Sequence, residues 1–228
     1  MEAREPTPGG VFVTGTGTEV GKTVVAAAIA RTLAAEGRRV AVFKPAVTGL
    51  DEGVETDPEI LRRASGTRQR DEEIAPYRYG PPASPHLAAA LAGEAIDPAR
   101  LRAAAQAAAA SAEAIVCEGV GGLLVPLRED YLVRDLAVDL GYPVVVVAPP
   151  GLGTINHTLL TVEAARAARL QVAAVALNPW PAEPGEIERS NLETIRALGG
   201  AEVLTYPRID LGDPATWPPI HLPAVVRR

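Results

Sequence analysis

The sequence predicts an α/β fold in which a doubly wound, mainly parallel sheet carries helices on both faces. Short apolar segments alternate along the chain with helical patterns, as expected for right-handed crossover units. Val144 to Val147 form an apolar run without polar alternation, which is typical of a parallel strand covered on both faces. Ligands bind such sheets at the carboxyl ends of their strands, so we expect the functional residues to gather there.

The individual elements follow from local pattern. The strand-like segments are 11–14, 39–43, 114–118, 143–148, 172–177 and, more weakly, 202–205. The helical patterns cover 21–36, 57–64, 86–91, 98–112, 131–140, 154–169 and 186–198. The alanine-rich part of 98–112 favours a plain helix because alanine is the best helix former. Segments 50–56 and 70–85 have many turn residues and no periodicity, so we expect loops that border a site.

Size and composition bound the possible functions. The 228 residues are 47% hydrophobic and 22% charged, which favours one soluble domain spanning residues 1–228. A net charge of -6 without a cluster of basic residues argues against a nucleic-acid partner. The first ten residues lack an apolar core, so we expect neither a secretory signal nor a membrane anchor, and a cytoplasmic protein. The single cysteine, Cys117, excludes an internal disulfide.

A glycine-rich turn follows the first strand. Residues 13–23 read Val-Thr-Gly-Thr-Gly-Thr-Glu-Val-Gly-Lys-Thr, with an apolar strand before them and a helical pattern after them. In such a loop the backbone N–H groups cradle phosphates, Lys22 meets the terminal phosphates, and the Thr23 hydroxyl serves magnesium. Gly15 and Gly21 are separated by five residues rather than four, so this is a variant P-loop. The predicted fold class is therefore P-loop NTPase-like, with ATP or GTP as the nucleotide.

Other polar residues follow predicted strands. Lys44 precedes Pro45, which favours an extended backbone, and its side chain either reaches the nucleotide or lies at the surface. Glu118, beside glycines, suits a magnesium ligand because Mg²⁺ prefers a few hard oxygens. Asp57 is a second candidate carboxylate, although on the residues alone it reads as part of a helix start. The histidines and Cys117 show no spacing typical of zinc ligands.

Two further segments carry weaker signals. Gly151-Leu152-Gly153-Thr154 precedes a helix, and a helix N-terminus binds carboxylate or phosphate or is simply a helix start. Asn178, between a strand and Pro179, offers a donor and an acceptor to a nucleobase or makes a turn.

These blocks together resemble the dethiobiotin synthetase family. The resemblance is carried by the residues at 12–23, by Lys44-Pro45-Ala46-Val47-Thr48-Gly49, by Ser84-Pro85-His86, by Glu118-Gly119-Val120-Gly121-Gly122 and by Gly153-Thr154-Ile155-Asn156-His157. It implies an enzyme that uses ATP and Mg²⁺ to close the ureido ring of dethiobiotin from 7,8-diaminononanoate and CO2, releasing ADP and phosphate in biotin biosynthesis. It also implies a homodimer whose other partners are small molecules, without a nucleic-acid or membrane partner.

The resemblance also assigns roles to residues. Lys22 and Lys44 are the catalytic residues it implies, with Lys44 at the carbamate. The implied magnesium ligands are Thr23, Asp57 and Glu118. The implied nucleotide-binding residues are Thr18, Glu19, Val20, Gly21, Lys22, Thr23, Asp57, Glu118, Gly119, Val120, Gly121, Asn178, Pro179, Pro207, Arg208 and Ile209. The implied substrate-binding residues are Thr48, Gly153, Thr154 and Asn156, the last three at the substrate carboxylate across a dimer interface.

Three other functions fit the P-loop. A partition-type ATPase switch normally has a second lysine early in this loop, whereas the residues here are Gly15-Thr16-Gly17. An amidotransferase-type synthetase needs an ammonia source, and a glutaminase domain does not fit within these residues. A homologue that binds without catalysis would be expected to lack polar groups that are all present here.

Overall fold

A six-stranded parallel sheet forms the centre of the molecule. The structure is a computed structural model that describes residues 9–52 and 55–222. The strands are β1 (Gly9–Gly15), β2 (Val40–Phe43), β5 (Ala114–Gly122), β8 (Val144–Ala148), β9 (Val172–Trp180) and β10 (Glu202–Pro207). They lie in the order β10-β9-β8-β1-β5-β2, and every neighbouring pair is parallel. This order, with β1 between β8 and β5, confirms the predicted doubly wound sheet.

Alternation along each strand divides the apolar side chains between two cores. In β1, Val11 and Val13 belong to one core and Phe12 to the other. In β8, Val145 and Val147 lie with the first core, whereas Val144 and Val146 lie with the second. Because both sets are buried, the strands need apolar residues at every position, which explains the uninterrupted run in β8.

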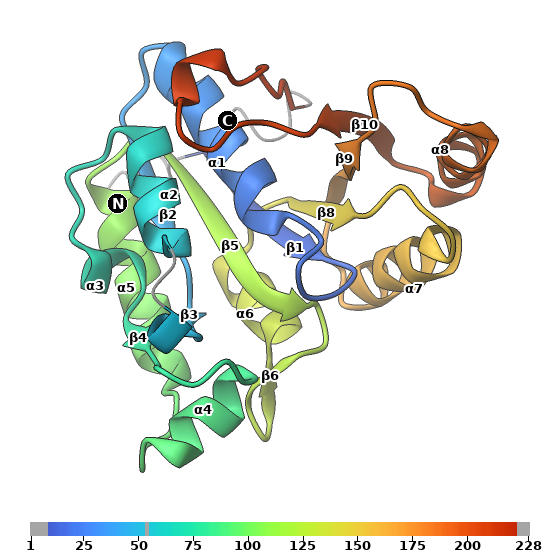
Figure 1. Ribbon diagram of the computed structural model, residues 1–228. Helices are drawn as coiled ribbons and strands as arrows, with labels where there is room; N and C mark the ends of the chain where they lie inside the picture. The colour runs from blue at the N-terminus through green and yellow to red at the C-terminus, as the bar shows by residue number, and fades with distance from the viewer. Residues whose placement is uncertain (1–8, 53–54, 223–228) are drawn as a thin grey trace, which may run out of the picture.

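Helices cover both faces of the sheet (Figure 1). The helices are α1 (Lys22–Ala35), α2 (Asp57–Ser65), α3 (Asp71–Ile74), α4 (Pro85–Leu91), α5 (Pro98–Ala110), α6 (Val133–Leu140), α7 (Thr154–Ala167) and α8 (Glu186–Gly199), with short 3-10 turns at η1 (Leu50–Glu52) and η2 (Pro214–Thr216). Helices α1 and α2 pack on the core that contains Val11 and Val13. Helices α4 to α8 contribute to the core that contains Phe12.

The C-terminal segment lies over α1. Its backbone N–H at Ile220 donates to the Thr32 hydroxyl of α1 at 2.9 Å. Trp217, Ile220 and Leu222 join the core on that side, and Tyr206 donates to the Pro218 carbonyl at 3.1 Å. The red segment that crosses above α1 in Figure 1 therefore closes one side of the core.

Several local predictions are wrong, among them two outside the site. The predicted loop at 70–85 contains the short helix α3 and the strand β4 (Tyr77–Arg78), which pairs in parallel with β3 (Ala46–Val47). The predicted helix at 131–140 begins only at Val133, because Tyr131–Leu132 forms β7 opposite β6 (Pro126–Arg128). These strands have two or three residues, too few for periodicity to reveal.

The predicted absence of a signal or anchor concerns residues that lie mostly outside the described ones, which begin at Gly9. Among residues 9–52 and 55–222, none of the helices combines the length and the apolar character that crossing a membrane requires.

Candidate active site

The glycine-rich loop runs from the end of β1 to the start of α1. Gly21 precedes α1 with a left-handed backbone (φ 85°, ψ 30°), and no side chain caps the helix. A Cβ atom on Gly15 would lie 2.7 Å from the Val20 side chain, so the loop closes tightly. The Nζ of Lys22 donates to the Gly17 carbonyl at 2.8 Å. The first turn of α1 thus presents uncapped N–H groups, an arrangement that binds phosphate.

Four polar side chains meet beside this loop. The Nζ of Lys44 lies 2.7 Å from Asp57 Oδ2 and 2.7 Å from Glu118 Oε1. The Thr23 hydroxyl oxygen lies 2.8 Å from Asp57 Oδ1 and 2.9 Å from Glu118 Oε1, so its single proton can be donated to either carboxylate. Each of these four residues, from separate parts of the sequence, thus lies within hydrogen-bond distance of two of the others.

Burial makes the charges of this cluster interact strongly. The side chains of Lys44, Glu118 and Asp57 are 4%, 0% and 35% exposed. Burial alone would lower the pKa of Lys44, but the attraction of Glu118 and Asp57 outweighs it and raises that pKa. Burial alone would raise the pKa of Asp57, but the attraction of Lys44 and its hydrogen bonds lower it. Lys44 and Asp57 are therefore both charged at neutral pH.

The two lysines of this site, Lys22 and Lys44, are the only lysines in the sequence. Both are buried, and burial lowers the pKa of Lys22, with a further contribution from the charge of Lys44. The other basic side chains counted in the net charge are all arginines. The chain thus confines its two ammonium groups, which act as compact point charges, to one site.

The sheet order explains why these residues meet. Strand β5 lies between β1 and β2, so the P-loop, Glu118 and Lys44 come from three adjacent strands. Glu118 does not end its strand as predicted, since β5 continues to Gly122 and its register with β1 shifts after Val13. A Cβ atom on Gly119 would lie 3.0 Å from Val133, so this part of the strand has little room for side chains.

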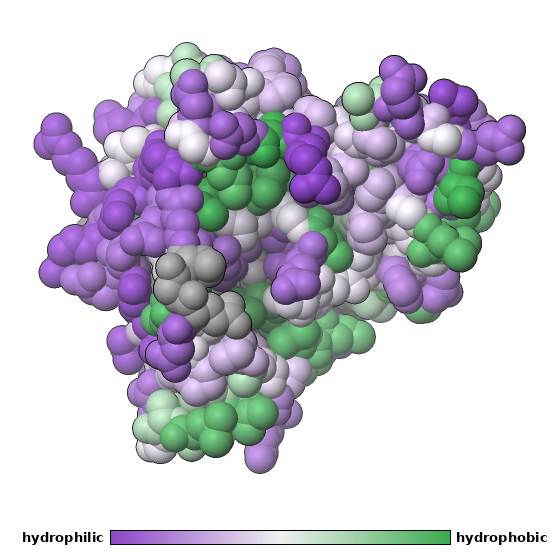
Figure 2. All heavy atoms as spheres, in the orientation of Figure 1, coloured by the Kyte–Doolittle hydropathy of each residue, from purple (hydrophilic) through white to green (hydrophobic). Residues whose placement is uncertain are grey.

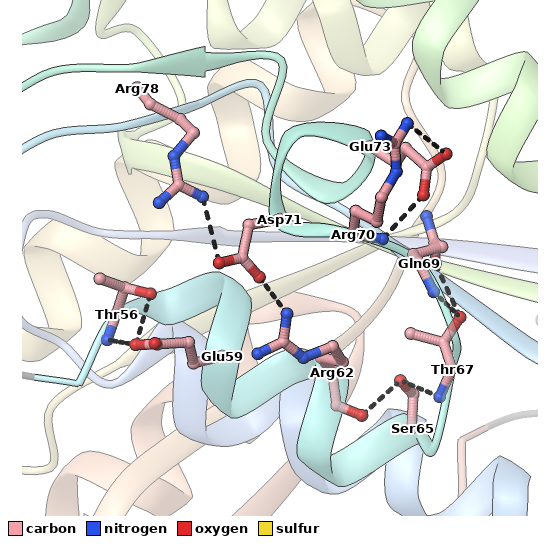
Figure 3. A network of polar contacts seen from close by, with 10 residues as sticks. All are labelled: Thr56, Glu59, Arg62, Ser65, Thr67, Gln69, Arg70, Asp71, Glu73 and Arg78. Carbon is pink, nitrogen blue, oxygen red and sulfur yellow. Dashed lines mark hydrogen bonds and ion pairs between the residues drawn. The ribbon is translucent and has the colours of Figure 1, made fainter.

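A polar network fixes the helix that carries Asp57. At the start of α2, the N–H and hydroxyl of Thr56 donate to Glu59 at 2.7 and 2.8 Å, forming a capping box. Further along α2, Arg62 pairs with Asp71, which also lies 3.5 Å from Arg78 of β4 (Figure 3). Asp71 therefore connects α2 to the β3–β4 pair, which follows Lys44 in the sequence.

The donor set of the cluster fits magnesium. Thr23, Asp57 and Glu118 offer hydroxyl and carboxylate oxygens, the ligands that Mg²⁺ prefers. The second oxygen of Glu118, Oε2, is buried and has no hydrogen-bond partner among the described residues. A buried carboxylate oxygen without a partner is costly unless it meets a ligand.

Asn178 lies against the P-loop from the side of β9. Its Nδ2 donates to the Val20 carbonyl at 3.4 Å, and a Cβ atom on Gly21 would lie 1.9 Å from that nitrogen. Its Oδ1 is buried and has no partner in the described part of the chain. Pro207, at the end of the neighbouring strand β10, pairs in register with Trp180, so the predicted base-binding segments lie on adjacent strands.

The predicted substrate residues belong to two other segments of the chain. Thr48 follows β3 and is half-buried. At the start of α7, Gly153 has a left-handed backbone (φ 90°) and Asn156 is exposed. Thr154 instead faces inward, where its hydroxyl lies 3.3 Å from that of Thr158 and its N–H donates to Gly151.

Comparison with known proteins identifies the family. A family model described as an AAA domain matches residues 9–209. The ATP-dependent dethiobiotin synthetase of Anaeromyxobacter dehalogenans (strain 2CP-1 / ATCC BAA-258) is 50% identical over 169 residues, which are 74% of this chain and 76% of the relative. The protein of the same name from Bacillus subtilis (strain 168) is 38% identical over 196 residues, covering 86% of this chain and 85% of the relative.

Solved structures show the same fold. The signal recognition particle receptor FtsY from Elizabethkingia anophelis has a TM-score of 0.54 at 13% identity, covering 98% of this chain and 64% of its own. The signal recognition particle 54 kDa protein from Aeropyrum pernix K1, solved with GDP, has a TM-score of 0.56 at 15% identity. The match covers 99% of this chain and 46% of that protein's chain. At these identities the likeness supports the P-loop NTPase fold alone. Because the sequence relatives match over most of both lengths, the chain belongs to the ATP-dependent dethiobiotin synthetase family.

Proposed function

We propose that this chain closes the ureido ring of dethiobiotin from 7,8-diaminononanoate and CO2, using ATP and Mg²⁺. The observation that carries the proposal is the convergence of Lys22, Lys44, Thr23, Asp57 and Glu118 beside an uncapped P-loop helix, in a chain of this family. We further propose that the single domain of residues 1–228 contains all groups that one protomer contributes.

The reaction needs an activated carbamate. One amine of the substrate adds to CO2, and an oxygen of the resulting carbamate attacks the γ-phosphorus of ATP while the bond to ADP breaks. The second amine then attacks the carbonyl carbon, the ring closes, and phosphate leaves with the electron pair of the broken C–O bond. Negative charge accumulates on the carbamate and the transferred phosphoryl group, so fixed cations are the main requirement.

The two lysines supply those cations. Lys22, at the start of α1, is assigned to the ATP phosphates, where its ammonium exchanges the Gly17 carbonyl for phosphate oxygens. Lys44, held between Asp57 and Glu118, is assigned to the carbamate. Because Lys44 is already oriented by two carboxylates, little reorganisation is needed when charge develops.

Thr23, Asp57 and Glu118 are the residues that would hold magnesium. Bound Mg²⁺ would supply positive charge to the transferring phosphoryl group. The unpartnered Oε2 of Glu118 supports this assignment.

The segment around Asn178 is assigned to the base. Its buried Oδ1 lacks a partner among the described residues, so it is an acceptor available to the amino group of adenine. Pro179, Pro207, Arg208 and Ile209 are assigned to the border of the base. The remaining nucleotide contacts proposed are backbone contacts from Thr18, Glu19, Val20, Gly21, Gly119, Val120 and Gly121.

We propose a homodimer that works in the cytoplasm and receives the substrate carboxylate near Gly153 and Asn156, with Thr48 beside the carbamate. Leu152 is 93% exposed, and Leu87 and Leu91 of α4 are 47% and 65% exposed. Figure 2 shows hydrophobic side chains gathered over α4 at the lower edge and near α7 and α8 at the right. Exposed apolar patches of this kind are typical of protein interfaces.

The test is incubation with diaminononanoate, labelled bicarbonate, Mg²⁺ and ATP, followed by mass spectrometry. We expect a cyclic urea that carries the label and one ADP for each ring closed. ATP hydrolysis without labelled product would contradict the proposal, and product that requires glutamine would favour the amidotransferase-type function instead.

A further inference from the structure

One buried side chain makes two hydrogen bonds to the backbone of the loop between β8 and α7. The Nδ2 of Asn191, in α8, donates to the Pro150 carbonyl at 2.8 Å and to the Gly151 carbonyl at 3.0 Å. Asn191 is only 6% exposed. The N–H of Thr154 donates to the same Gly151 carbonyl at 3.2 Å. The two carbonyl oxygens are therefore directed toward α8 and the protein interior.

The same loop and the helix after it also carry donors. Gly153 (φ 90°, ψ -14°) occupies the third position of a turn from Gly151 to Thr154, with the left-handed backbone that a type II turn requires there. No side chain caps α7. The N–H groups of Ile155 and Asn156, in its first turn, have no acceptor within the helix. The loop thus combines carbonyls that Asn191 holds with N–H groups that have no acceptor within the helix.

We propose that Asn191 is the positioning residue of the substrate carboxylate site. The inference rests on the proposed function, in which the start of α7 receives that carboxylate. A carbonyl oxygen turned outward would repel a carboxylate, and Gly151, which has no Cβ atom, permits such a rotation. Asn191 prevents it because both of its amide hydrogens are used by the two carbonyls. The donors at α7 therefore stay free for the negatively charged end of the substrate.

A pair of substrates separates this role from a purely structural one. The first is 7,8-diaminononanoate, and the second is 2,3-diaminooctane, the same diamine without the carboxyl group. Only the first can report on a carboxylate site. The quantity measured is the ratio of kcat/KM for the acid to kcat/KM for the diamine. We expect Asn191→Ala to lower this ratio about tenfold through a higher KM for the acid, with kcat little changed.

The chain offers a matched control at the other end of the same two helices, which lie side by side in Figure 1. Arg166 of α7 donates to the carbonyls of Gly199 and Gly200, both at 2.7 Å. Arg166→Ala removes contacts of the same kind between α7 and the end of α8. We expect it to lower stability while the substrate ratio stays at the wild-type value.

Other outcomes overturn the proposal. The idea is wrong if the ratio is unchanged in Asn191→Ala, or if it falls equally in Arg166→Ala. Should Asn191→Ala fail to fold, Asn191→Ser, which keeps one shorter donor, is measured in the same way and should give an intermediate ratio. If the wild type closes the ring of neither diamine, the proposed function itself fails, and this outcome is distinct from an unchanged ratio.

Discussion

Replacing Lys44 with methionine tests the electrostatics of the site. Methionine keeps most of the side-chain volume, so the main loss is the ammonium that lies 2.7 Å from each of two carboxylates. Breaking a buried ion pair by removing one partner costs about 3–5 kcal/mol of folding free energy. The Glu118 side chain is 0% exposed, so water does not screen its carboxylate when the ammonium is removed. Asp57 is 35% exposed and is partly screened by water. We therefore expect Lys44→Met to lower the free energy of unfolding by about 3 kcal/mol, the low end of this range.

The assay is urea unfolding in EDTA, followed by thermal unfolding. For a chain of this length a loss of about 3 kcal/mol corresponds to a fall in Tm of about 6–12 °C. Adding Glu118→Gln to Lys44→Met removes the buried negative charge, so the double variant should regain part of the stability. If Lys44→Met unfolds within about 0.5 kcal/mol of the wild type, the cost assigned to these buried charges is wrong.

Three further predictions follow. Lys44→Ala should keep ATP affinity and lose turnover by about 10²–10³-fold, as for the loss of one preorganised charge-stabilising group; near-wild-type steady-state rates would remove Lys44 from the mechanism. Gly21→Ala should abolish ATP binding measured by calorimetry, because its Cβ atom would lie 1.9 Å from Asn178, whereas Gly66→Ala, with a similar left-handed backbone and nothing within 4 Å, should bind ATP normally. Glu59→Ala should cost about 1 kcal/mol of unfolding free energy at pH 7, when the capping box at the start of α2 is lost. Since the hydrogen bond from the Thr56 N–H lowers the pKa of Glu59 in the folded state, its contribution is present above the unfolded-state pKa and disappears as pH falls through the folded-state value. Wild type and Glu59→Ala should thus converge once the pH is below the lowered, folded-state pKa of Glu59, and a constant difference at all pH values would contradict the assigned cap.

The sequence allowed the sheet and the P-loop to be predicted because both are local signals. The apolar run of β8 is continuous within one short segment, and the spacing from Gly15 to Lys22 lies within another. The predicted fold class is confirmed by the parallel sheet and by the structures it resembles. The short strands β3, β4, β6 and β7 could not be predicted, because two or three residues are too few to show a hydrophobic periodicity.

The candidate site depends on contacts that no local pattern contains. Asp57 reads in the sequence as a helix start, and only the packing of α2 places it 2.7 Å from Lys44. Asn191 was not singled out, although one signal was available: it lies one helical turn before Ile195, on the inward stripe of α8, where a polar residue needs a partner. The sequence shows that the chain has only two lysines, but only the fold brings their charges close enough to affect each other. The individual ligand contacts of the site residues stay predictions.

Calorimetric titration of the wild type with ATP at saturating Mg²⁺ tests the central claim, that a triphosphate binds at the loop between β1 and α1. We predict one site per protomer, with the heat lost in Gly21→Ala and retained in Gly66→Ala. No heat from any nucleoside triphosphate in the wild type, or undiminished binding in Gly21→Ala, would contradict it.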